Sequence, residues 1–128
     1  VITSMSPSEG DDDITIIGST TEPQLESVPS RVRLRLKKLP GYFTGTGDLL
    51  AALLVAKLHC HQGRFAAALE EAVAALQGVM AVTADAQGGI AADDRSAEAF
   101  RARELRVVQG QYLLEHPEVV HRAEPVGG

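Results

Sequence analysis

The stretch "RVRLRLKKLPGYFTGTGDLLAALLVAKLHCH", residues 31–61, changes its hydrophobic period halfway along. In residues 31–38 apolar and basic side chains alternate, which is the period of a half-buried strand. We expect the apolar side chains of this strand to face a core and the basic ones to form a solvated face. Residues 48–61 are apolar nearly all round, which predicts a helix that is covered on several sides.

The motif "GTGD", residues 45–48, lies between these two patterns. A helix start carries unpaired N–H groups and a partial positive charge, and glycines let a ligand approach the backbone closely. The motif can therefore hold an anion, most often a phosphate, with Asp48 beside it to take a proton from an attacking hydroxyl. The alternative is a plain turn in which Thr46 or Asp48 only caps the helix.

The rest of the chain predicts further short strands and a second helix. "VIT", residues 1–3, is typical of a strand end whose beginning is missing, so we expect a piece of a longer protein. "ITIIG", residues 14–18, is a short β-branched run and predicts a strand. Residues 64–86 place apolar side chains at three- and four-residue steps, which predicts a helix. Gly88 and Gly89 open a loop.

A third helix is predicted from a cap at Ser96 through Leu114, and Pro117 would end it. Its packing face would consist of Phe100, Leu105, Val108 and Tyr112. We expect the tail "EPVGG" to be frayed.

Composition excludes several classes of protein. The 128 residues suit one domain, and a net charge of −5 argues against a nucleic-acid-binding surface. The longest apolar run, residues 49–56, is too short to cross a bilayer, so we expect no membrane partner. A single cysteine, Cys60, cannot form an internal disulfide, which favours a reducing compartment.

Two clusters could be mistaken for metal sites. His59 and His61 are two residues apart, so on a helix they point in different directions and cannot easily chelate one ion. Histidines at a helix C-terminus are better explained by the helix dipole. The acids of residues 11–13 are expected to be solvated.

The segment "GYFTGTGDLLAALLVAKLH" resembles the signature of the ribokinase superfamily. "VITSM" and "EEAVAALQGVM" are similar to a strand end and a helix of that superfamily, and "ELRVVQGQYLLEHPEVV" resembles the C-terminal helix and tail of the pyridoxal kinase family. The resemblance implies an α/β chain, the C-terminal portion of a three-layer α/β/α fold, with short strands followed by about three helices. It would be a single partial domain: strands and loops in 1–40, anion hole and helices in 41–116, and a tail in 117–128.

The resemblance also implies an activity, which is transfer of the ATP γ-phosphate to the 5′-hydroxymethyl group of pyridoxal, pyridoxine or pyridoxamine. It implies Mg²⁺, a monovalent cation such as K⁺ or Na⁺, a homodimer and a cytoplasmic location, and we expect this segment to be inactive alone. Two alternatives stay open. One is a related kinase for hydroxymethylpyrimidine or a sugar, and the other is a truncated, non-catalytic product that only binds a partner.

Site residues follow from the same resemblance. Asp48 would be the general base, the backbone amides of Gly45, Thr46 and Gly47 would form the anion hole, and Gly45 and Asp48 would border the substrate. It implies no metal ligand in this chain. The residues that would contact ATP are Thr3, Ser4, Leu39, Pro40, Gly41, Phe43, Thr46 and Met80.

Overall fold

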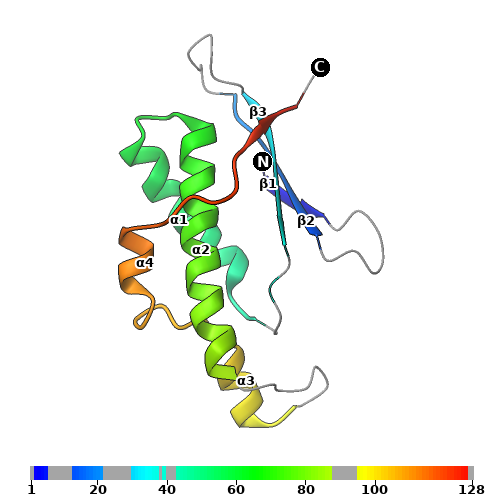
Figure 1. Ribbon diagram of the computed structural model, residues 1–128, viewed down its shortest axis with the longest axis vertical. Coiled ribbons are helices and arrows are strands. Elements are labelled where there is room, and N and C mark those ends of the chain that lie inside the picture. Colours follow the sequence, from blue (N-terminus) through cyan, green and yellow to red (C-terminus); the bar gives the residue numbers. More distant parts are fainter. Residues whose placement is uncertain are drawn as a thin grey trace.

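A computed structural model describes residues 2–5, 13–21, 30–37, 39, 43–87 and 95–126, and of residues 2–5 the backbone alone. Four strands form one antiparallel sheet in the order β1-β2-β3-β4, with bounds Ile2–Met5, Asp13–Ser19, Arg31–Lys37 and Glu124–Pro125. The helices of the described part are α1 (Thr46–Cys60), α2 (Phe65–Gln87), α3 (Ala97–Arg103) and α4 (Gln111–Glu115). All of these helices lie to one side of the sheet, so the described residues form two layers (Figure 1).

The alternating strand β3 is confirmed. Val32, Leu34 and Leu36 are buried, whereas the basic side chains between them are exposed or half-exposed. Because successive side chains of a strand point to opposite faces, this one strand supplies much of the sheet's contribution to the core. The basic face is partly neutralised, since Arg33 pairs with Glu124 across the sheet at 3.2 Å.

The tail adds a strand, so the expectation that it is frayed is wrong for its first residues. Glu124 and Pro125 of β4 pair with Arg33 and Val32, and the Val126 N–H donates to a carbonyl of β3 at 3.0 Å. The edge of β3 offers unpaired backbone groups, which a neighbouring extended segment satisfies. The composition of the tail gives no sign of this pairing.

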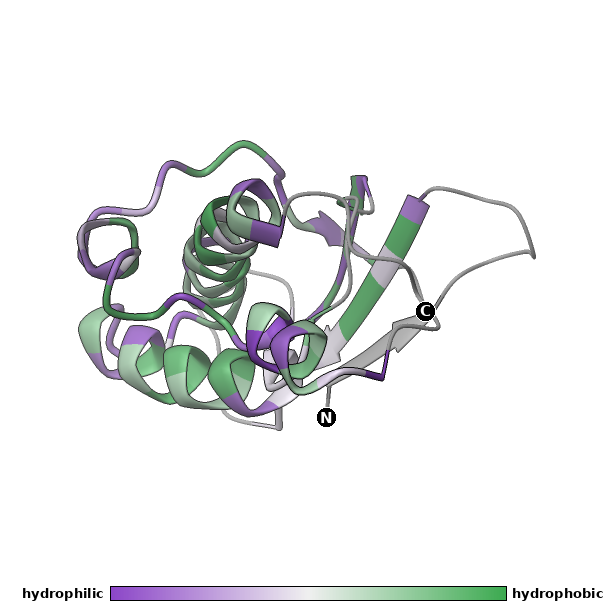
Figure 2. Cartoon of the chain, turned by 90° about the horizontal axis from the view of Figure 1, so that it is seen from below, coloured by the Kyte–Doolittle hydropathy of each residue, from purple (hydrophilic) through white to green (hydrophobic). Residues whose placement is uncertain are grey.

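Helix α2 is the centre of the core, as the periodicity of residues 64–86 predicts. One face, with Phe65, Leu69 and Val73, packs on the sheet, and another face, with Ala72 and Leu76, packs on α1. By length and composition α2 could cross a membrane, but in this fold it is a core helix that packs on both the sheet and α1. Figure 2 shows that the long helices carry hydrophobic residues along most of their length.

Helix α1 begins at Thr46, two residues before the predicted start, and is covered on one side only. Leu53 is its one buried residue, and Val55 is 71% exposed. The expectation that this helix is covered on several sides is therefore wrong within the described residues. The apolar composition shows that the helix can be buried, but it does not show which element covers it.

An ionic cluster joins the C-terminal end of α1 to α2. Glu71 accepts from His61 at 3.1 Å and from Lys57 at 3.5 Å. Burial raises the pKa of Glu71, but the hydrogen bonds and charges of His61 and Lys57 lower it further, so the net pKa lies below its ordinary value. This pairing also accounts for His61 without a metal ion.

The predicted third helix is interrupted, so its continuity and its packing face are both wrong. Ser96 caps α3 as expected, accepting from the Ala99 N–H at 3.1 Å. The helix then ends at Arg103 and the chain is extended at Glu104. Of the four residues expected to form the packing face, three are exposed: Phe100 is 48% exposed, Val108 81% and Tyr112 68%. Among these four, Leu105 alone packs against the core.

Tertiary hydrogen bonds explain the interruption. The Arg106 N–H donates at 3.0 Å to the hydroxyl of Thr83, a fully buried residue of α2, which itself donates to the Val79 carbonyl. Gly110 lies so close to α2 that an added Cβ would be 2.9 Å from Val79 Cγ2. These contacts, distant in sequence, outweigh the local helix propensity of the segment.

The Thr83 hydroxyl can be tested directly. We expect Thr83→Val to lower the free energy of unfolding by about 1–3 kcal/mol, because the Arg106 N–H loses its acceptor inside the protein. Thr83→Ser keeps the hydroxyl, so its free energy of unfolding should fall by less than that of Thr83→Val. Urea denaturation followed by circular dichroism measures both, and equal losses would show that the methyl group, not the hydrogen bond, matters at this position.

Acid should weaken the contact between α1 and α2. Because the pKa of Glu71 is lowered from 4.5 in the folded state, its contribution to stability is present above that value and is lost as the pH falls through the folded pKa. We expect Glu71→Gln to be less stable than the native protein at neutral pH and to lose less stability on acidification. Glu118→Gln, at an exposed carboxylate, is the control and should lose stability with falling pH as the native protein does. If Glu71→Gln also lost as much stability as the native protein over this pH range, Glu71 would not be the group responsible.

Candidate functional site

The turn before α1 leaves a row of backbone donors open. Gly45 has φ 87° and ψ 9°, in the left-handed region, and is the N-cap of α1 without any side-chain capping bond. The first intrahelical bond runs from the Leu49 N–H to the Gly45 carbonyl at 3.0 Å, so the N–H groups of residues 45–48 have no partner within the helix. The interpretation that Thr46 or Asp48 caps the helix is therefore wrong.

The space in front of these donors is also open. A Cβ added at Gly45 or at Gly47 would meet, apart from its chain neighbours and the backbone of its own helix, no described atom within 4 Å. An anion can therefore approach the backbone, where the helix start supplies a partial positive charge as well as hydrogen-bond donors. These features fit a phosphate group, which needs several convergent donors.

Asp48 is exposed in the first turn of α1, next to the open N–H groups. No ion pair or side-chain hydrogen bond within the described part of the chain engages its carboxylate. A carboxylate that is neither paired with a cation nor hydrogen-bonded can accept a proton from an incoming hydroxyl. Its place beside an anion site is what a proton acceptor in phosphoryl transfer requires.

The turn is anchored by a segment far away in the sequence. The Thr44 N–H donates to the Arg103 carbonyl at 2.8 Å, and the Thr44 hydroxyl donates to the same oxygen at 3.3 Å. The end of α3 is held in turn by α2, since the Gln87 amide donates to the Ala102 carbonyl at 3.2 Å. Sequence reasoning missed this support, because nothing in the residues around Thr44 indicates a partner 59 positions later.

A cavity of about 180 Å³, here called the base cavity, extends from the start of α1 along α2 toward the end of β3. It brings together three of the residues expected to contact ATP, Leu39, Thr46 and Met80, with Gly47 of the anion site. Its other described walls are mostly aliphatic. An apolar cavity that opens from a phosphate-binding turn fits the flat base of a nucleotide.

The other residues predicted to contact ATP do not line the base cavity or lie outside the described residues. Thr3 and Ser4 lie in β1, where the backbone puts Ser4 beside Ile16, a residue of the base cavity. Phe43 is half-buried but is not among the described residues that line this cavity. Pro40 and Gly41 lie outside the described residues. Gln77, which lines the cavity wall, was not singled out from the sequence.

The described residues contain no cluster of three or more His, Cys, Asp or Glu side chains that could hold a metal ion. Asp13, the described member of the acidic run, pairs with Lys37 at 2.6 Å. Cys60 is an exposed free thiol. In the described part of the chain, the polar groups at the start of α1 are the backbone N–H donors and the carboxylate of Asp48.

Comparison with known proteins gives a consistent result. No family model matches the chain. Bovine (Bos taurus) pyridoxal kinase is 37% identical over 131 residues, which cover 96% of this chain but 40% of the bovine protein. The chain thus spans well under half the length of the curated relatives it matches.

Solved structures agree. Pyridoxal kinase from Leishmania donovani in complex with ADP superposes with a TM-score of 0.71 at 25% identity, covering 97% of this chain and 38% of that protein. The same enzyme with ADP and pyridoxamine gives a TM-score of 0.61 at 26% identity over 90% of this chain and 35% of that protein. The chain is therefore homologous, over nearly its whole length, to the C-terminal part of the pyridoxal kinases, and it has their ribokinase-like fold.

Proposed function

We propose that the complete gene product containing this chain transfers the γ-phosphate of ATP to the 5′-hydroxymethyl group of pyridoxal, pyridoxine or pyridoxamine. The observation that carries this proposal is the uncapped start of α1, whose open N–H groups lie beside the exposed carboxylate of Asp48. The similarity to pyridoxal kinases, one of them solved with ADP and pyridoxamine, gives the substrate class.

The backbone of residues 45–47 binds the phosphoryl group during transfer. Charge spreads over the phosphoryl oxygens in the transition state, and preorganised N–H donors in a fixed turn stabilise that charge without reorganising. Gly45 makes this geometry possible, because its left-handed conformation turns the chain into the helix and no side chain fills the anion site.

Asp48 takes the proton from the substrate hydroxyl as that oxygen attacks phosphorus. Its carboxylate and Gly45 border the alcohol, while Leu39, Thr46 and Met80 hold the nucleotide through the base cavity. The strand β1, with Thr3 and Ser4, approaches the cavity wall through its pairing with β2. This assignment places acceptor activation and phosphate binding within one helical turn.

We extend the proposal to the surroundings of the reaction. Mg²⁺ would be held by the ATP phosphates and by groups outside the described residues, and a monovalent cation such as K⁺ or Na⁺ would assist. A homodimer and a cytoplasmic location follow from the resemblance to the family, and the exposed single thiol of Cys60 suits a reducing compartment.

The substrate class is tested with purified complete gene product, ATP and a panel of alcohols. We expect phosphorylation of the three vitamers and neither of hydroxymethylpyrimidine nor of sugars. Preference for one of the other alcohols would assign the protein to another ribokinase-like activity. Absence of turnover with every alcohol would favour a non-catalytic product that only binds a partner.

If Asp48 is the general base, its replacement should lower kcat strongly without weakening ATP binding. In the complete gene product, Asp48→Asn should lower kcat by roughly a hundredfold or more, because the amide cannot accept the proton, while the KM for ATP changes little. Asp85→Asn, at another exposed aspartate of the same helical layer, is the matched control. Steady-state kinetics decides, and an unchanged kcat would remove Asp48 from the role of base.

The two left-handed glycines at the ends of α1 form a matched pair. Gly45 (φ 87°) and Gly63 (φ 81°) both have open space around a would-be Cβ. Alanine at either position should cost about 1–2 kcal/mol of stability, because that backbone conformation disfavours a side chain. We expect Gly45→Ala alone to lower kcat/KM for ATP by tenfold or more, as the donors lose their alignment. An equal kcat/KM for ATP in Gly45→Ala and Gly63→Ala would contradict the proposal that the turn at Gly45 binds the phosphates.

A further inference from the structure

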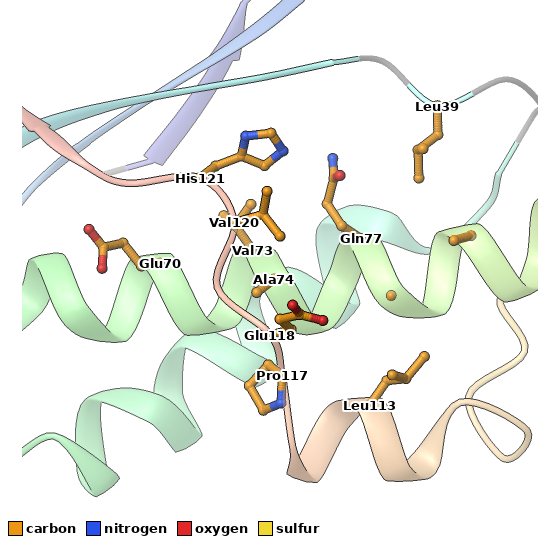
Figure 3. A pocket seen from close by; sticks show the side chains of 12 residues that line it. Leu39, Glu70, Val73, Ala74, Gln77, Leu113, Pro117, Glu118, Val120 and His121 are labelled. Atoms are coloured by element: carbon orange, nitrogen blue, oxygen red, sulfur yellow. The ribbon is translucent and has the colours of Figure 1, made fainter.

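A second cavity, here called the tail pocket, lies between α2 and the segment that follows α4. Its volume is about 280 Å³. Figure 3 shows α2 along one side, Pro117, Val120 and His121 of the C-terminal segment crossing over it, and Leu39 facing the helix across the opening. None of the residues predicted to be catalytic lines this pocket.

The tail pocket and the base cavity share a wall. Leu39, Val73 and Gln77 line both of them. The base cavity begins at the anion site and runs along α2 toward this wall. On the proposed function, on which this inference rests, a nucleotide with its phosphates at the start of α1 and its base in the base cavity presents the outer edge of the base to the shared wall.

Gln77 is the polar group of that wall. The residue is half-buried, its neighbours in the base cavity are mostly aliphatic, and its carboxamide makes no hydrogen bond within the part of the chain that the structure describes. Figure 3 shows the side chain directed away from α2, toward the opening between Leu39 and His121. A carboxamide carries two N–H donors and one acceptor oxygen, and at this opening these groups are available to a ligand.

The far side of the tail pocket is held in place. Glu70 of α2 accepts from the Ala123 N–H at 2.8 Å and pairs with Arg122 at 3.2 Å. Beyond these residues the chain joins the sheet as β4. These contacts fix the C-terminal segment to α2 on the far side of the tail pocket, so the pocket that Gln77 lines is part of the folded structure.

We propose that Gln77 recognises the base of the nucleotide. Its carboxamide oxygen accepts from the exocyclic amino group of adenine, and its NH₂ group donates to an adjacent ring nitrogen, at the wall shared by the two cavities. Leu39 and Val73 provide the apolar contacts above and below this edge. Gln77 thus determines nucleotide selectivity, while the anion site and Asp48 perform the transfer.

The test compares ATP with purine riboside triphosphate, which lacks the exocyclic amino group. In the complete gene product, Gln77→Leu should raise the KM for ATP roughly two- to tenfold, the value of one or two neutral hydrogen bonds, with kcat unchanged. The KM for purine riboside triphosphate should change by a smaller factor. Gln77→Met, closer in shape, should reproduce this pattern if the leucine variant folds poorly.

Gln109→Leu, at an exposed glutamine that lines neither cavity, is the matched control. An equal rise in KM for both nucleotides would show that Gln77 only shapes the wall, and no rise for ATP would show that it does not touch the base. Either result overturns the inference while the native protein still uses ATP. A native protein that does not bind ATP overturns the proposed function as well, which separates the two failures.

Discussion

The unpaired backbone N–H groups at the start of α1 are the feature on which the site depends. A helix start ordinarily finds a capping side chain, but here the N-cap residue is Gly45, in a left-handed conformation, and within the described residues it makes no side-chain capping bond. The helix is stable without a cap because Leu53 and its neighbours pack on α2. The donors can therefore face open space and still hold their alignment.

This alignment is maintained from the second half of the chain. Helix α2 has buried residues from Phe65 to Gln87, and its last turns carry two polar residues, Thr83 and Gln87, that bond to the backbone at the end of α3 and just after it. That backbone accepts two hydrogen bonds from Thr44, the residue before the anion turn. A short motif near the start of the helical layer thus derives its geometry from residues about 40 to 60 positions later.

The sequence was informative where one local pattern determines the structure. The alternation in β3, the apolar face of α2 and the cap at Ser96 depend on neighbouring residues alone, and each is confirmed. The break between α3 and α4 could not be predicted, because bonds from α2 and from Thr44 impose it. The pairing of β4 likewise depends on the free edge of β3, which the composition of the tail does not show.

The candidate site likewise combines residues that a local motif predicts with residues that only the fold brings together. Gly45, Gly47 and Asp48 were found from a motif, and the base cavity brings Leu39 and Met80 together with Gly47. Gln77 also lines that cavity, although a glutamine on a helix gives no sequence signal of this kind. The outward face of α1 was expected to be covered, but within the described residues it is exposed, because apolar composition alone does not supply a covering element.

The most direct test of the account is a titration of the ¹⁵N-labelled complete gene product with ATP, followed by amide chemical shifts. We expect the amides of residues 45–47 to shift most strongly and in parallel, because the phosphates accept hydrogen bonds from them. Saturable ATP binding that leaves these amides unchanged and moves others would contradict the claim that the start of α1 holds the transferred phosphate.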